Sequence, residues 1–155
     1  MKFLGFIATA LMISSAQAAW NCKDVSAKLQ QQNPGSEINL TVSCLPQVSS
    51  DPRPLCLTVL KISEDLFQYH TNRYNQEASE LVLSPVSSAT NKTAHFGLIT
   101  LRMENHLEGY PEWKSTTVYS PVLSQLYVDY YRFSKHLDAY EHIENQSYSC
   151  KILRK

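Results

Sequence analysis

Hydrophobic and polar residues alternate in short runs along much of the chain, which is typical of antiparallel β-structure. Residues 37–44 give the clearest run, and four apolar side chains are predicted on one of its faces. They are Ile38, Leu40, Val42 and Cys44. The polar residues between them predict a second face in contact with water. Residues 56–62 are mostly apolar at every position, which predicts a strand buried on both faces.

Further segments complete the predicted fold. Five more strands are expected at residues 80–86, 94–103, 116–120, 126–133 and 147–153. Residues 24–32 predict a short helix that stops at the following Asn-Pro-Gly sequence. Residues 63–75 and 135–144 fit a helix or a strand equally well. The pattern predicts a mainly β protein, either an antiparallel sandwich or a small barrel of about 7 strands, with a short N-terminal helix.

The first 18 residues differ from the rest of the chain. Lys2 precedes an uncharged apolar run at residues 3–13, and the small residues Ala16 and Ala18 follow it. This order predicts a cleavable secretory signal peptide at residues 1–18. A transmembrane anchor is the alternative, but it needs about 20 apolar residues. We therefore expect a single β-rich domain at residues 19–155, secreted or periplasmic, without a membrane span.

All four cysteines, Cys22, Cys44, Cys56 and Cys150, follow the predicted signal peptide. An even number in an oxidising compartment predicts two disulfides, and three pairings are possible. We favour Cys44–Cys56, which would close a Pro-rich segment, and Cys22–Cys150, which would join the two ends of the domain. Metal ligation by these cysteines is disfavoured because no C-x-x-C pair is present.

Charge and glycine content exclude several classes of function. The chain has 14 Lys and Arg against 14 Asp and Glu, and basic residues gather only at its C-terminal end. We therefore expect no nucleic-acid partner. Neither a phosphate-binding glycine loop nor the G-x-S-x-G pattern of a serine nucleophile occurs. The sequence thus predicts no cofactor and no catalytic residue.

One cluster has a composition that suits a metal. His136, Asp138 and His142 share a face if the segment is a strand, and Asp138 and His142 are neighbours if it is a helix. Imidazole and carboxylate groups are ligands for zinc or copper. The spacing matches no zinc motif, however, and a solvated polar surface has the same composition. We therefore predict no metal site and keep this set as the alternative.

Aromatic residues give the candidate binding surface. Tyr110 and Trp113 flank a predicted turn, where contact loops are common, and both residue types are enriched at interface hot spots. The alternative is that Trp113 covers the open end of the core. Tyrosines are frequent in the last third of the chain, where alternation should place some inside and some on the surface. They are Tyr119, Tyr127, Tyr130, Tyr131, Tyr140 and Tyr148.

Two functional hypotheses remain. The first is a secreted or periplasmic binding module without catalytic activity, which contacts a protein or glycan outside the cytosol through Tyr110 and Trp113. An inhibitor of a hydrolase is a special case, since inhibition needs shape and no catalytic groups. The alternative is a small secreted hydrolase or metal-binding protein that uses the His136–His142 region. The lack of a catalytic motif favours the first hypothesis.

Overall fold

The computed structural model describes residues 19–91, 101–107 and 110–154, which form one helix and eight strands. The predicted signal peptide lies outside these residues. The elements are α1 (Cys22–Gln32), β1 (Glu37–Val48), β2 (Leu55–Ser63), β3 (Leu66–Arg73), β4 (Ser84–Asn91), β5 (Leu101–Leu107), β6 (Tyr110–Ser120), β7 (Gln125–Ser134) and β8 (Ala139–Arg154).

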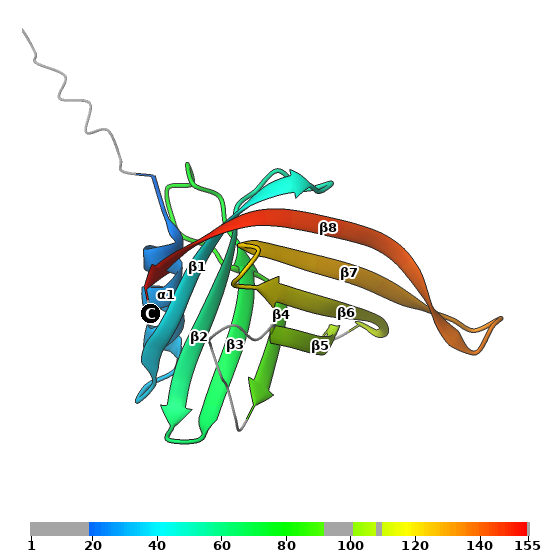
Figure 1. Cartoon of the computed structure of the whole chain (residues 1–155), viewed down its shortest axis with the longest axis horizontal. Helices are drawn as coiled ribbons and strands as arrows, with labels where there is room; N and C mark the ends of the chain where they lie inside the picture. The colour runs from blue at the N-terminus through cyan, green and yellow to red at the C-terminus, as the bar shows by residue number, and fades with distance from the viewer. Residues whose placement is uncertain (1–18, 92–100, 108–109, 155) are drawn as a thin grey trace, which may run out of the picture.

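All eight strands belong to one antiparallel sheet with the order β4-β3-β2-β1-β8-β7-β6-β5. Two four-stranded meanders, β1–β4 and β5–β8, are joined where β1 pairs with β8. The sheet curls, so that Cα atoms of its edge strands β4 and β5 come within 8 Å of each other (Figure 1). The mainly β prediction is confirmed, with one short helix and two disulfides. The sandwich and the count of about 7 strands are not confirmed.

The first core cluster lies inside the curl. It combines buried side chains from six strands of both meanders: Leu40, Val42, Cys44, Leu55, Leu57, Val59, Tyr69, Tyr119, Leu126, Val128, Tyr148 and Cys150. Full burial of one such aliphatic side chain stabilises the fold by about 1.5–3 kcal/mol. Because residues of both meanders meet here, this cluster holds the curled shape.

The second core cluster lies on the opposite face of β1 and β2, beneath α1. Val25 and Leu29 of the helix pack there with Leu60 of β2. The Asn21 side chain caps α1 by accepting a 2.8 Å hydrogen bond from the Lys23 amide. The helix ends before Gly35, whose φ of 86° suits a residue without a side chain. This arrangement confirms the predicted helix and explains why β2 is apolar on both faces.

Buried hydroxyl groups fix the helix on the sheet. Ser26 Oγ of α1 lies 2.8 Å from Thr41 Oγ1 of β1 and 2.8 Å from Thr58 Oγ1 of β2. All three side chains are buried. The prediction that Thr41 faces water was therefore wrong, because α1 covers this part of the polar face. Ile38 also leaves its predicted face, because a bulge between Ile38 and Leu40 shifts the register and places Ile38 against the helix cluster.

The disulfides connect Cys22 to Cys56 and Cys44 to Cys150, so the pairing that we favoured from the sequence was wrong. Cys44 points into the curl and Cys56 toward α1, and cysteines on opposite faces of a sheet cannot be bridged. Cys44 and Cys150 occupy directly paired positions of β1 and β8, with a Cα–Cα distance of 4.1 Å. Cys22–Cys56 ties α1 to β2.

The predicted strands differ from the observed strands mainly at their ends. Residues 126–133 and 147–153 lie within β7 and β8, and 116–120 is the last part of a longer β6. The ambiguous segment 63–75 contains β3, and the strand expected at 80–86 begins only at Ser84. Of the strand expected at 94–103, residues 101–103 belong to β5 and the rest lies outside the described residues.

Removal of each disulfide tests the connectivity. The bridges span 34 and 106 residues, so loop-closure entropy predicts a loss of about 4 kcal/mol for Cys22→Ala/Cys56→Ala and about 5 kcal/mol for Cys44→Ala/Cys150→Ala. Urea unfolding measures both losses. Peptide mapping without reduction should recover the Cys22–Cys56 and Cys44–Cys150 pairs, and a Cys44–Cys56 peptide would contradict the structure.

Candidate functional site

A three-stranded extension protrudes from the curled sheet. Residues 147–154 of β8 pair with β1, whereas residues 139–146 of β8 pair with β7 alone. The β7–β8 hairpin therefore continues beyond the core, as Figure 1 shows, and the first part of β6 pairs along it. We call residues 111–114 and 131–143 the extension. Its strands have exposed side chains that do not contribute to the hydrophobic core.

Trp113 and Arg132 form the centre of one face of the extension. They occupy directly paired positions of β6 and β7, and the guanidinium carbon lies 5.6 Å from the centroid of the indole ring. Such a cation–π contact contributes about 0.5–1 kcal/mol at an exposed site. Trp113 is half-buried and belongs to neither core cluster. A cleft of about 560 Å³ lies beside Arg132, and its lining residues are Glu112, Arg132, Phe133, Ser134, Lys135, Glu141 and Ile143.

The opposite face of the extension has a row of aromatic side chains. The ammonium group of Lys114 lies 5.1 Å from the ring centroid of Tyr131 and 4.6 Å from that of Tyr140. Tyr131 meets His142, and Tyr140 meets Phe133, in edge-to-face contacts with centroids 5.4 and 5.3 Å apart. These contacts fix the side chains before any partner arrives, which reduces the entropy cost of binding.

Tyr110 and Trp113 do not flank a turn, because both belong to β6. Tyr110 begins this strand, and its side chain lies outside the described part of the structure. The sequence pattern did not identify Arg132, Lys114 or Phe133. Alternation along residues 126–133 could have assigned the faces of Arg132 and Phe133, but the pairing of Trp113 with Arg132 depends on the register between two strands.

The candidate metal ligands lie in two different parts of the β7–β8 hairpin. His136 and Asp138 lie in the exposed turn between β7 and β8, where Asp138 has a φ of 49°. His142 lies in β8, with its Nε2 atom 3.2 Å from Asp129 Oδ1, an oxygen that also accepts a 3.1 Å hydrogen bond from Asn145. Within residues 19–91, 101–107 and 110–154, no group of three His, Cys, Asp or Glu residues is placed to hold a metal ion.

The tyrosines of the last third divide between the two faces of the sheet, as alternation predicts. Tyr119 and Tyr148 are fully buried inside the curl, and Tyr130 packs against the same cluster. Burial raises the pKa of Tyr130 to about 12. Tyr131 and Tyr140 are half-buried on the outside. Tyr127 is also half-buried, but it lies on β7 outside the extension. Three of these tyrosines, Tyr127, Tyr131 and Tyr140, are therefore partly accessible, and two of the three belong to the extension.

A partly buried polar network supports the base of the extension. Arg73 of β3 donates a 3.1 Å hydrogen bond to the Tyr148 hydroxyl, and its Nε lies 3.6 Å from Asp51 Oδ2 in the β1–β2 loop. Arg53 donates to both carboxylate oxygens of Asp51, at 3.0 and 2.6 Å. The hydrogen bond from Arg53 lowers the pKa of Asp51 to about 2. Ser50 of the same loop donates a 2.9 Å hydrogen bond to Glu144 of β8.

Comparison of the sequence with models of protein families and with characterised proteins finds no match. The helix of the described residues is too short and too polar to cross a membrane. The two disulfides are compatible with an extracellular location.

The Asp51 network should make the free energy of unfolding depend on pH. The pKa of Asp51 is lowered in the folded protein, so its contribution is complete above about pH 4 and is lost as the pH falls toward 2. We expect Asp51→Asn to lower the free energy of unfolding by about 1 kcal/mol at pH 7, since solvent screens the exposed side of the carboxylate.

Urea unfolding of both proteins at pH 7, 4 and 2 measures this difference, which should be mostly lost at pH 2, where about half of the Asp51 carboxylate is protonated. Glu64→Gln is the matched control, because its carboxylate is 91% exposed beside Lys61 and should contribute less than about 0.5 kcal/mol. An equal loss at all three pH values would contradict the assignment to Asp51 ionisation.

Proposed function

We propose that this protein is a non-catalytic binding module that acts outside the cytosol, secreted or in the periplasm, and that it contacts a protein partner through the extension. The observation that carries this proposal is the Trp113–Arg132 pair, which lies on paired strands outside both core clusters. Inhibition of a hydrolase is the special case in which the projecting hairpin enters the partner's cleft.

The residue types at this face suit a binding hot spot. Tryptophan and arginine dominate the energetics of protein interfaces, since each buries a large area and also offers polar contacts. The adjacent cleft has both charge signs, from Arg132 and Lys135 and from Glu112 and Glu141. Mixed charge around an aromatic centre gives a partner several ion pairs that fix its orientation.

The scaffold keeps the extension in one arrangement. The surface is built on hydrogen-bonded strands, and the Cys44–Cys150 disulfide fixes β8 to β1 at the base of the hairpin. A surface that is ordered before binding loses less conformational entropy on association. The predicted signal peptide at residues 1–18 and the two disulfides support a site of action outside the cytosol.

Substitution of the central pair tests the proposal. A partner is captured from the native envelope or medium with residues 19–155, purified, and its Kd measured for wild type and for Trp113→Ala and Arg132→Ala. We expect each substitution to weaken binding about 30-fold, which is the effect of losing about 2 kcal/mol at a hot spot.

Val122→Ala/Leu123→Ala is the matched control, because these apolar side chains are exposed but lie in the β6–β7 turn, outside the extension. The control should bind as wild type does. Equal affinity of all four proteins would refute the proposed surface. A fall in Tm of more than about 5 °C for Trp113→Ala would instead make Trp113 a core residue.

A further inference from the structure

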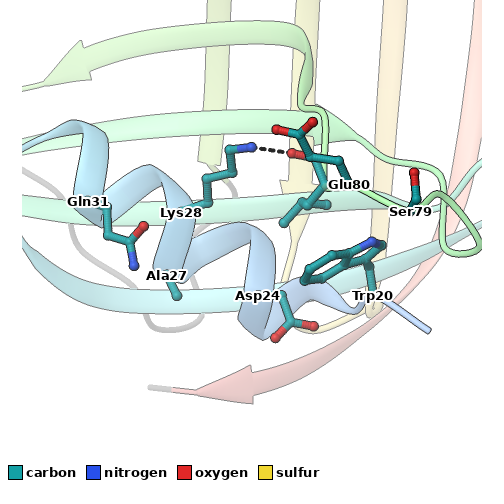
Figure 2. A pocket seen from close by; sticks show the side chains of 8 residues that line it. Trp20, Asp24, Ala27, Lys28, Gln31, Ser79 and Glu80 are labelled. Carbon is teal, nitrogen blue, oxygen red and sulfur yellow. Dashed lines mark hydrogen bonds between the residues drawn. The ribbon is translucent and has the colours of Figure 1, made fainter. Parts of the chain in front are cut away.

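A second cleft lies between α1 and residues 79–81, which are distant in sequence from the extension. Figure 2 shows it from close by, and its volume is about 440 Å³, within the usual range for small-molecule sites. The lining residues are Trp20, Asp24, Ala27, Lys28, Gln31, Ser79, Glu80 and Leu81. None of them belongs to the extension, so the cleft is a separate site.

The indole ring of Trp20 is fixed at one end of this cleft. Its Nε1 donates a 2.8 Å hydrogen bond to the carbonyl of Ala78, and its backbone amide donates a 3.0 Å hydrogen bond to the carbonyl of Gln76. The ring also packs against the core cluster beneath α1. Trp20 nevertheless remains partly exposed, and Figure 2 shows it bordering the opening. The cleft therefore has a rigid aromatic wall.

Polar side chains surround the rest of the opening. Gln31 lies at the end of the cleft away from Trp20. Ser79 and Glu80 lie on the side of the cleft opposite the helix (Figure 2). All three are exposed. The ammonium group of Lys28 donates a hydrogen bond to the carbonyl of Leu81 and so connects the two sides of the cleft. Asp24 accepts a 2.9 Å hydrogen bond from the Asn21 amide.

We propose that this cleft binds a neutral sugar unit of a glycan. A pyranose ring has an apolar face of C–H groups, which fits against a fixed indole ring, and a rim of hydroxyls that both donate and accept hydrogen bonds. Amide, hydroxyl and carboxylate groups at Gln31, Ser79 and Glu80 complement that rim. With two carboxylates against one amine in the lining, an acidic sugar is repelled.

The chain has two tryptophans, Trp20 and Trp113, so Trp113→Phe leaves Trp20 as the sole indole fluorophore. This variant is titrated with cellobiose, lactose and N,N′-diacetylchitobiose, and with digalacturonic acid as the acidic comparator. We expect a saturable change in fluorescence with at least one neutral disaccharide, and at least about tenfold weaker binding of the acid. Glu80→Gln should reduce the difference in affinity between the neutral disaccharides and digalacturonic acid.

Calorimetry with Trp20 variants separates a loss of contact from a loss of folding. Trp20→Phe should retain saccharide binding and Trp20→Ala should lose it at least about tenfold, while both keep the circular dichroism spectrum of the wild type. The absence of a saturable signal for all three neutral sugars, equal binding by Trp20→Ala, or tighter binding of the acid would overturn the proposal. Trp113→Ala should bind the sugar normally, so this test is independent of the extension.

Discussion

The pairing of β1 with β8 is the interaction on which the rest of the structure depends. Each meander alone is a four-stranded sheet with one apolar face that needs cover. The β1–β8 ladder brings the two faces together, and Leu40, Val42 and Val59 then share one buried cluster with Leu126 and Val128. The Cys44–Cys150 disulfide lies in this ladder, so the covalent bond and the hydrogen bonds impose the same register.

Burial on both faces of β1 and β2 divides the molecule into a packed part and an exposed part. Inside the curl these strands meet the other meander, and outside they meet α1, which is held by the Cys22–Cys56 disulfide and the Ser26 hydroxyl contacts. Within residues 19–91, 101–107 and 110–154, no helix covers the extension, because residues 139–146 of β8 extend beyond β1 and pair with β7 alone. The side chains of the Trp113–Arg132 pair belong to neither core cluster, so their contribution to the packing of the core is small.

The β1–β2 loop connects the two parts. Ser50 and Asp51 reach across to Glu144 of β8 and to Arg73 of β3, so polar contacts continue the sheet pairing where the hydrophobic core ends. A partly buried guanidinium is costly unless its donors are used, and Tyr148 and Asp51 compensate Arg73. The base of the extension is thus fixed by polar groups, while its two faces present aromatic side chains to solvent.

Local pattern alone determined the mainly β class, the helix before Gly35 and the deep burial of β2, because alternation, capping and turn residues act between near neighbours. The tertiary structure decided what depends on contacts across the chain. A bulge moved Ile38 to the helix side, the faces of Cys44 and Cys56 set the disulfide pairing, and strand register placed Arg132 on Trp113. A sequence lists the side chains of each strand, but only the folded sheet fixes which strands are neighbours and how they are aligned.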